Sequence, residues 1–245
     1  VLLVDGTYDD AFELCLRAAP EFGWYSRNTG YNPYMSEGKK TVSYEICEQL
    51  TAAGSESGAT WSVPDVVVVP VGDGCIIGGV HKGFQDLLAL GWIERMPRLV
   101  GVQAAGSSPL VDAWERGLEG WDMQPAEAHS LADSIVAGLP RDRIKALRAV
   151  RQSGGAFLRV TDDQIVAAIP ALAQGCGVFA EPAAAASYAG LVEAVKLGLI
   201  HAGEEVVILA TGSGLKDVAT AIRSVGQPAV VAPDLDAVRH LVNKQ

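Results

Sequence analysis

Apolar and polar positions along the chain predict strands that alternate with longer helices from Trp61 onward. The clearest strand runs from Asp65 to Val71 and contains four consecutive valines. Such a run suits a strand that helices cover on both faces, because β-branched side chains pack well on a pleated surface. A helix is predicted to follow from about Gly79 to Leu90. This order is typical of βα units in a largely parallel sheet.

Later segments repeat the pattern. Strands are predicted over residues 98–103, 156–160 and 205–210, and helices over 109–116, from Thr161 onward, over 182–198 and from about Lys216. Thr161 and Gln164 fit a capping box, in which two side chains satisfy two backbone donors reciprocally. Pro170 is expected to kink its helix, since it has no amide hydrogen to donate. The chain is therefore predicted to form an α/β fold with a three-layer, doubly wound, mostly parallel sheet.

The first 50 residues have a different pattern. They predict a strand at residues 1–4, a helix over 9–19, a short strand at 24–26 and a loop over 28–40. A complete α/β domain normally needs about 100 residues or more. We therefore expect residues 1–50 to be the tail of a smaller α/β domain and its return segment, and residues 51–245 to form a large domain. Val1 begins an apolar strand without an initiator Met, so we expect that the beginning of the chain is missing.

Composition excludes several classes of protein. Of the 245 residues, 49% are hydrophobic and 20% are charged, which is enough apolar material for a sizeable core. The formal net charge of -10 and the lack of a Lys/Arg stripe argue against nucleic-acid binding. No apolar run reaches the roughly 18 residues that a membrane span needs. The four cysteines contain no CxxC pair, so we expect a soluble protein in a reducing cytoplasm.

A glycine-rich loop follows the valine strand and includes Gly72, Asp73, Gly74, Cys75 and Ile76. It places backbone amides and a helix N-terminus at the carboxyl end of the sheet, which suits a phosphate group. Glycine lets the backbone approach an anion closely. A plain strand-to-helix turn explains a lone glycine cluster equally well. The loop is neither a Walker loop nor a clean GxGxxG.

A second glycine turn runs from Thr211 to Asp217 after the strand at 205–210. Two such turns after parallel strands can line one crevice. Lys216 in this turn is a conceivable nucleophile, but a solvated or ion-paired lysine beside Asp217 explains it better. The four histidines lack metal-ligand spacing, and no metal site is expected.

Six segments together resemble the threonine synthase branch of the fold-type II pyridoxal-phosphate enzymes, which also contains serine and threonine dehydratases and tryptophan synthase β chains. The segments occur in family order over nearly the whole chain, and their joint order carries the resemblance. They are residues 4–11, 32–41, 64–83, 99–104, 179–183 and 211–217.

The resemblance implies that pyridoxal 5'-phosphate is the cofactor. In the family the loop after the valine strand binds the cofactor phosphate, which maps to Gly72, Asp73, Gly74, Cys75 and Ile76. Thr211 matches the hydroxyl offered to the pyridine nitrogen. A neutral partner leaves that nitrogen largely unprotonated and the ring a weaker electron sink, which suits β-elimination and β-replacement.

The resemblance also implies that the Schiff-base lysine and the asparagine loop for the substrate carboxylate lie before the position of Val1. Neither motif is present in this sequence. Lys39 and Lys40 match an ordinary motif that leads into a helix, and Lys216 matches the final turn. No catalytic residue is therefore assigned, and this chain alone is expected not to be catalytic.

The sequence departs from threonine synthase at the substrate phosphate. Members that use O-phosphohomoserine resemble Asn-Pro-x-Arg in the loop of Asn32 and carry a further asparagine in the cofactor-phosphate loop. Met35 stands in place of that arginine, and Cys75-Ile76 in place of the asparagine region. Methionine cannot supply the charged fork that makes arginine suited to phosphate. Arg27 is a candidate to compensate.

The leading interpretation is a pyridoxal-phosphate-dependent carbon-oxygen lyase that resembles threonine synthase and converts O-phosphohomoserine to threonine by β/γ-elimination and replacement. A threonine- or serine-dehydratase-like ammonia-lyase is the enzyme alternative, favoured by Met35 and Cys75. A degenerate cofactor-binding module is the non-enzyme alternative if the chain is naturally this short. A generic Rossmann-like nucleotide binder comes last, because the acidic ribose-binding residue is not recognisable. A small amino-acid substrate and a homodimer are expected.

Overall fold

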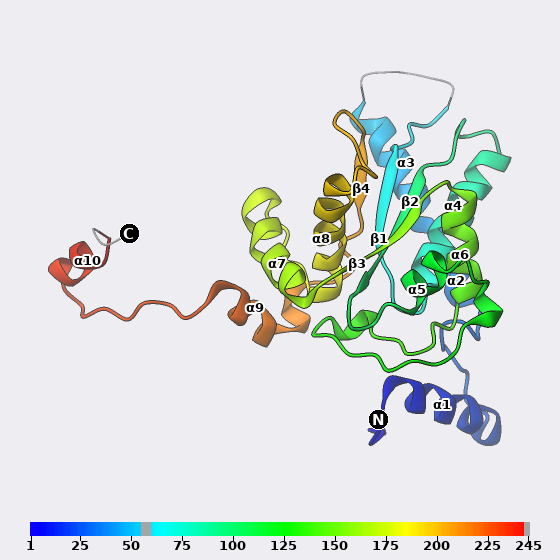
Figure 1. Cartoon of the computed structure of the whole chain (residues 1–245), viewed down its shortest axis with the longest axis horizontal. Helices are drawn as coiled ribbons and strands as arrows, with labels where there is room; N and C mark the ends of the chain where they lie inside the picture. Colours follow the sequence, from blue (N-terminus) through cyan, green and yellow to red (C-terminus); the bar gives the residue numbers. More distant parts are fainter. Residues whose placement is uncertain (55–59, 243–245) are drawn as a thin grey trace.

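The computed structural model describes residues 1–54 and 60–242. Its centre is a four-stranded parallel sheet in the order β3-β2-β1-β4 (Figure 1). The strands are β1 (Val66–Pro70), β2 (Arg98–Ala104), β3 (Ala156–Val160) and β4 (Val206–Ile208). Every paired strand runs parallel to its neighbour, as the sequence predicts.

Helices cover both faces of the sheet. Val67 and Val69 of β1 belong to a core with α4 (Cys75–Ala89), α5 (Pro109–Glu115) and α6 (Arg143–Gln152). Val66 and Val68 belong to a second core with α7 (Asp162–Cys176) and α8 (Pro182–Lys196). All four valines are fully buried. The predicted three-layer, doubly wound α/β architecture is therefore confirmed.

Further helices lie before and after this core. They are α1 (Tyr8–Phe22), α2 (Pro33–Lys39), α3 (Thr41–Ala53), α9 (Val218–Val225) and α10 (Leu235–Val242), with 3-10 turns at Gly120–Asp122, Asp133–Ile135 and Gly214–Lys216. α2 lies inside the stretch predicted as a loop. Asn32 caps it by accepting a hydrogen bond from the Tyr34 amide at 3.0 Å, and Pro33 occupies its first position.

Two predicted strands are absent, and one helix begins earlier than predicted. Residues 1–4 and 24–26 form no strand, because no described segment pairs with them. α4 begins at Cys75 rather than Gly79, since Gly78 and Gly79 lie inside the helix. A Cβ on Gly79 would lie 2.7 Å from the Cβ of Lys39, so glycine there permits a close crossing of α2 over α4.

Several local predictions can be compared with the structure. The capping box is confirmed, with the Thr161 amide donating to the Gln164 side chain at 2.7 Å and the Gln164 amide to Thr161 Oγ1 at 3.2 Å. α7 continues through Pro170 as one helix. Residue 50 falls within α3, and α3 packs against α4. The division of the chain into two domains remains a prediction.

The carboxyl ends of the parallel strands meet at one edge of the sheet. Figure 1 shows α1 beyond this edge, close to the loops that leave the strands. α9 packs against α7, and the chain after α9 extends away from the sheet. Within residues 1–54 and 60–242, no helix is long and apolar enough to cross a bilayer.

Candidate active site

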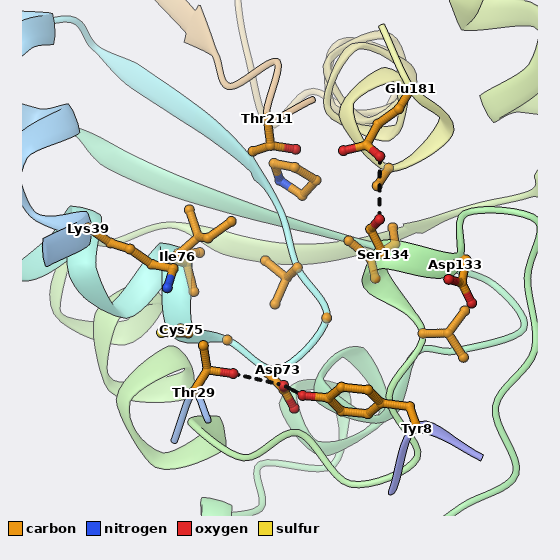
Figure 2. A pocket seen from close by; sticks show the side chains of 18 of the residues that line it. Tyr8, Thr29, Lys39, Asp73, Cys75, Ile76, Asp133, Ser134, Glu181 and Thr211 are labelled. Atoms are coloured by element: carbon orange, nitrogen blue, oxygen red, sulfur yellow. Dashed lines mark hydrogen bonds between the residues drawn. The ribbon is translucent and has the colours of Figure 1, made fainter. Parts of the chain in front are cut away.

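A cavity of about 410 Å³ lies at the carboxyl ends of β1 and β4. All six residues that the sequence analysis assigns to the cofactor, Gly72–Ile76 and Thr211, line it (Figure 2). The two glycine-rich turns therefore meet at one cavity. Other residues that line the cavity include Tyr8, Thr29, Lys39, Ser134, Ile135, Glu181 and Lys216.

The loop after β1 is packed so tightly that glycine is needed at two positions. A Cβ on Gly72 would lie 2.9 Å from the Cα of Ile135. Gly74 has φ +87°, and a Cβ there would lie 2.7 Å from the Cβ of Ala146. α4 begins directly afterwards at Cys75 without a side-chain cap. The first amides of α4 thus have no capping side chain, which is the arrangement that binds an anion at a helix N-terminus.

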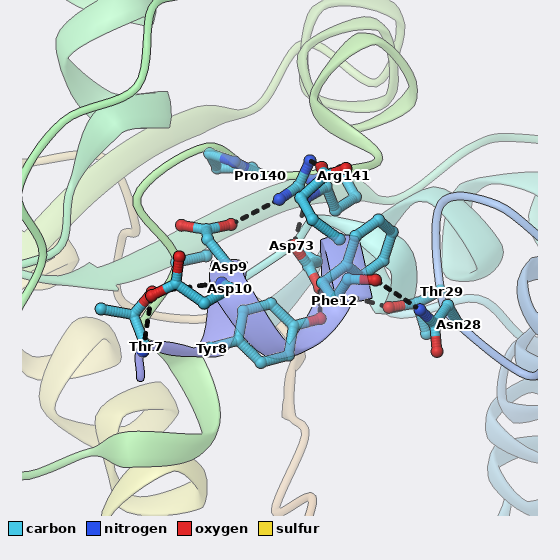
Figure 3. A network of polar contacts seen from close by, with 12 residues as sticks. Thr7, Tyr8, Asp9, Asp10, Phe12, Asn28, Thr29, Asp73, Pro140 and Arg141 are labelled. Carbon is cyan, nitrogen blue, oxygen red and sulfur yellow. Dashed lines mark hydrogen bonds and ion pairs between the residues drawn. The ribbon is translucent and has the colours of Figure 1, made fainter. Parts of the chain in front are cut away.

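The Asp73 carboxylate joins this loop to α1 and its neighbours (Figure 3). The hydroxyls of Tyr8 and Thr29 donate to Asp73 Oδ2 at 2.5 and 3.2 Å, and the Arg141 amide donates to Oδ1 at 3.0 Å. Burial, together with the Asp73 carboxylate, raises the pKa of Tyr8 well above its usual range. These three donors satisfy the carboxylate and partly offset its negative charge at the cavity.

Arg141 holds α1 over the site. Its Nη2 lies 2.7 Å from Asp9 Oδ1 and its Nη1 lies 2.8 Å from Glu13 Oε1. The guanidinium carbon lies 4.2 Å from the centre of the Phe12 ring, within cation-π range. Figure 3 shows Arg141 with Asp9 and Phe12 next to the Asp73 network. α1 is therefore attached to the glycine loop through charged and polar contacts.

Cys75 is buried in the first turn of α4, with its Sγ 3.5 Å from Ser36 Oγ. Burial raises the pKa of the thiol, although the Ser36 hydroxyl and the Lys39 ammonium act in the opposite direction. The thiol stays protonated at neutral pH. A nucleophilic role for Cys75 is therefore disfavoured, since the thiolate is the reactive form.

The other end of the cavity contains an ion pair with a buried carboxylate. Lys216 Nζ lies 2.8 Å from Glu181 Oε2, and the Ser134 hydroxyl donates to the same oxygen at 3.3 Å. The interpretation of Lys216 as an ion-paired lysine is correct, but its partner is Glu181. The carboxylate of Asp217 instead accepts a hydrogen bond from the Thr220 amide at 3.0 Å.

The structure places two other candidates differently. Arg27, the candidate to compensate for Met35, does not line the cavity and forms no ion pair within residues 1–54 and 60–242. Lys39, which the sequence analysis treats as part of an ordinary motif, lines the cavity. No three His, Cys, Asp or Glu side chains of the described residues form a group that could hold a metal ion.

Comparison with known proteins identifies relatives of the chain. Residues 1–212 match the family model described as pyridoxal-phosphate dependent enzyme. Threonine synthase of Methanocaldococcus jannaschii is 37% identical over 245 residues, which cover 100% of this chain and 58% of the relative. Threonine synthase of Mycobacterium leprae is 37% identical over 239 residues, which cover 97% and 60%. The chain spans about three fifths of the length of these curated relatives.

Solved structures show the same fold at lower identity. The processed form of threonine deaminase isoform 2 from Solanum lycopersicum superposes with a TM-score of 0.69 at 21% identity, covering 91% of this chain and 58% of that chain. Diaminopropionate ammonia lyase from Escherichia coli, in complex with an aminoacrylate-PLP azomethine intermediate, gives a TM-score of 0.68 at 16% identity, covering 91% and 57%.

Proposed function

The chain belongs to the pyridoxal-phosphate dependent enzymes, and on that premise we propose that its protein converts O-phosphohomoserine to threonine. Pyridoxal phosphate is the cofactor of this family, and the curated relatives at 34–39% identity are named threonine synthase. The single observation that carries the proposal is the uncapped N-terminus of α4 at the cavity. It supplies amides for a phosphate group where the family places one.

The residues present fit the cofactor. The proposed ligands of its phosphate are the backbone amides of Gly72–Ile76, which the loop presents at the start of a 15-residue helix. Gly72 and Gly74 line the cavity and add no side chain that would cover the loop backbone. The helix dipole adds a favourable field of roughly half a positive charge at that end.

Thr211 is proposed to bind the pyridine nitrogen through its hydroxyl. Its turn is attached to the segment before α8, because the Gly214 amide donates to the Phe179 carbonyl at 2.9 Å and the Glu181 amide to the Gly212 carbonyl at 3.0 Å. The Glu181 carboxylate beside this turn is paired with Lys216 at 2.8 Å. A hydroxyl can donate to an unprotonated ring nitrogen, which agrees with a neutral partner.

When bound, pyridoxal phosphate supplies an electron sink for the electron pair left at the substrate's α carbon. The chain's own residues hold the two ends of the cofactor and limit the access of water. The Asp73 network and Arg141 hold α1 against the loop, so they are proposed to shield the cavity once substrate is bound.

The test is turnover by the protein expressed from its complete gene and loaded with pyridoxal phosphate. Incubation with O-phosphohomoserine is expected to release phosphate and form threonine in equal amounts. Absence of both products, with the cofactor bound, would contradict the proposed reaction. Absence of cofactor binding would contradict the proposed site as well.

An ammonia-lyase is the second candidate, and one observation favours it. Ile76 lines the cavity with an apolar side chain, where a substrate phosphate would need polar partners, and Met35 stands where the resemblance expects an arginine. This candidate predicts ammonia and a 2-oxo acid from threonine or serine, with no phosphate released from O-phosphohomoserine. The two assays distinguish the candidates in one preparation.

A further inference from the structure

Lys39 is a lysine of the cavity wall to which the proposed function gives no role. It ends α2, which crosses α4 closely: a Cβ on Gly79 would lie 2.7 Å from Lys39 Cβ and 2.9 Å from the Ser36 carbonyl oxygen. The crossing fixes the start of the Lys39 side chain beside the first turn of α4. Figure 2 shows Lys39 on the same side of the cavity as Ile76 and away from Glu181.

No carboxylate of the described residues neutralises Lys39. Its ammonium donates to the Met35 carbonyl at 3.1 Å and forms no ion pair within residues 1–54 and 60–242. Contact with the last carbonyls of a helix is an ordinary role for lysine, but a carbonyl does not cancel its charge. The other cavity lysine, Lys216, is paired with Glu181 at 2.8 Å. The uncompensated positive charge therefore lies at the Lys39 side.

The nearby acidic groups do not change this balance. The Asp142 carboxylate, which accepts a hydrogen bond from Ser36, lies 2.6 Å from Lys145 Nζ and is paired with it. The Asp73 carboxylate already accepts three hydrogen bonds from other residues. Burial raises the pKa of Cys75, so its thiol gives Lys39 no thiolate partner at neutral pH. The amides at the start of α4 are donors and add to the positive potential. This side of the cavity therefore favours an anion.

We propose that Lys39, in place of an arginine at position 35, binds the phosphate at the far end of the substrate's side chain. The inference rests on the proposed function, because it places the substrate in the cofactor's cavity. Lys39 lies one helical turn after Met35 on the same face of α2. It thus supplies the cation that Met35 cannot, as a point charge able to follow a phosphate oxygen.

The phosphate of the cofactor is the other phosphate group that would lie in this cavity. The loop of Gly72–Ile76 offers several amides to one phosphate without a side chain. A second phosphate in the same cavity would repel the first, and an ammonium beside it reduces that cost. Substitution of Lys39 is therefore expected to weaken binding of the substrate phosphate and leave the cofactor affinity nearly unchanged.

The test compares Lys39→Met and Lys39→Arg with the matched control Lys40→Met. Lys40 bonds Glu37 and Asp86 at 2.9 and 3.2 Å and does not line the cavity, so its loss removes the same charge outside the site. The pyridoxal-phosphate-loaded protein from the complete gene is titrated with inorganic phosphate by calorimetry. The dissociation constant for pyridoxal phosphate is measured separately by fluorescence.

Lys39→Met is expected to weaken phosphate binding about 10- to 100-fold, the range of one charge-assisted hydrogen bond. Lys39→Arg is expected to restore most of it. Lys40→Met is expected to change it by no more than about twofold, because the Lys40 charge is paired with Glu37 and Asp86 and lies outside the cavity. In the active enzyme Lys39→Met is expected to raise KM for O-phosphohomoserine more than it lowers kcat.

Three results would overturn the inference: unchanged phosphate binding in Lys39→Met, no binding of inorganic phosphate to the loaded wild type, or a loss of affinity for the cofactor in place of phosphate. The titration needs no turnover. Phosphate binding that depends on Lys39 in a protein that forms no threonine would therefore refute the proposed reaction and leave the anion site in place.

Discussion

The two glycine-rich turns of the cavity follow parallel strands, yet they end in opposite ways. The turn after β1 leads from Gly74 into α4, a 15-residue helix without a side-chain cap. The turn after β4 leads into one 3-10 turn, where the Ser213 hydroxyl accepts a hydrogen bond from the Leu215 amide at 3.3 Å. Asp217 then caps α9 with its carboxylate. The two turns have similar sequences. The backbone amides after the β1 turn have no side-chain partner, whereas Ser213 and Asp217 bond the amides after the β4 turn.

This difference assigns the two ends of an elongated ligand. An anion is favoured at the uncapped start of α4, because the amides and the helix dipole point at it. At the β4 turn the carboxylate of Asp217 opposes a second anion, and Thr211 offers a neutral hydroxyl. We therefore expect the cofactor phosphate at the turn after β1 and not at the turn after β4.

Gly74→Ala, in the β1 turn, is expected to have the largest effect on cofactor affinity. A Cβ there is strained at φ +87° and would lie 2.7 Å from the Cβ of Ala146, so the loop must shift away from the ligand. We expect about a 100-fold loss of affinity for pyridoxal phosphate, measured by fluorescence titration.

Gly177→Ala is the matched control for backbone strain. Gly177 ends α7 with φ +74°, lies outside the cavity lining, and leaves open space of at least 4 Å around the point where a Cβ would lie. Its substitution is expected to cost about 1 kcal/mol of stability and leave cofactor affinity intact. Equal affinity losses in both variants would show that strain, and not the loop amides, explains the effect.

Thr211→Val tests the β4 turn and is expected to have the second largest effect. Loss of one hydroxyl removes about 1 kcal/mol of hydrogen bonding, which corresponds to roughly a five- to tenfold loss of cofactor affinity. Thr211→Ser keeps the hydroxyl and is expected to bind nearly as the wild type does. Equal binding by the valine and serine variants would remove Thr211 from the proposed site.

Tyr8→Phe tests how α1 supports the β1 turn. Removing the hydroxyl that donates to Asp73 is expected to lower the free energy of unfolding by about 1 kcal/mol at neutral pH. Because the folded protein raises the pKa of Tyr8, the unfolded chain loses this proton first, at about pH 10. The stabilisation is therefore complete below about pH 10 and declines above it.

Denaturant titrations from neutral pH upward check this prediction. The wild type is expected to lose stability above about pH 10 more steeply than Tyr8→Phe does. Parallel curves for the two proteins would contradict the assigned role of the Tyr8 proton.

Lys216→Met is expected to have the smallest effect on cofactor affinity, because Lys216 lies at the Glu181 end of the cavity and the Glu181 carboxylate keeps its hydrogen bond from Ser134. Affinity for pyridoxal phosphate is expected to change by no more than about twofold near neutral pH. A loss of affinity as large as that of Gly74→Ala would indicate that the phosphate binds at the β4 turn and not at the β1 turn. The measurement is the same fluorescence titration.

Much of the framework can be predicted from local sequence. The valines of β1, the glycines of both turns and Thr211 lie where the pattern of strands and turns places them. The sequence predicts the start of α4 too late, because Gly78 and Gly79 resemble a loop until their contact with α2 is known. The helix propensity of individual residues does not predict where two helices cross.

The contacts that complete the site cannot be predicted in this way, because they join distant parts of the chain. Arg141 meets Asp9 across 132 positions, and Tyr8 meets Asp73 across 65. The role of Glu181 as partner of Lys216 likewise depends on the turn after β4 lying against the start of α8. No periodicity or spacing in the sequence encodes these pairings.

The most direct test of the account compares pyridoxal phosphate with pyridoxal, which lacks the phosphate, in the wild type, Gly74→Ala and Thr211→Val. The ratio of the two dissociation constants isolates the contribution of the phosphate. We expect the ratio to approach one in Gly74→Ala and to stay near the wild-type value in Thr211→Val. A ratio that persists in Gly74→Ala and collapses in Thr211→Val would contradict the assignment of the phosphate to the uncapped start of α4.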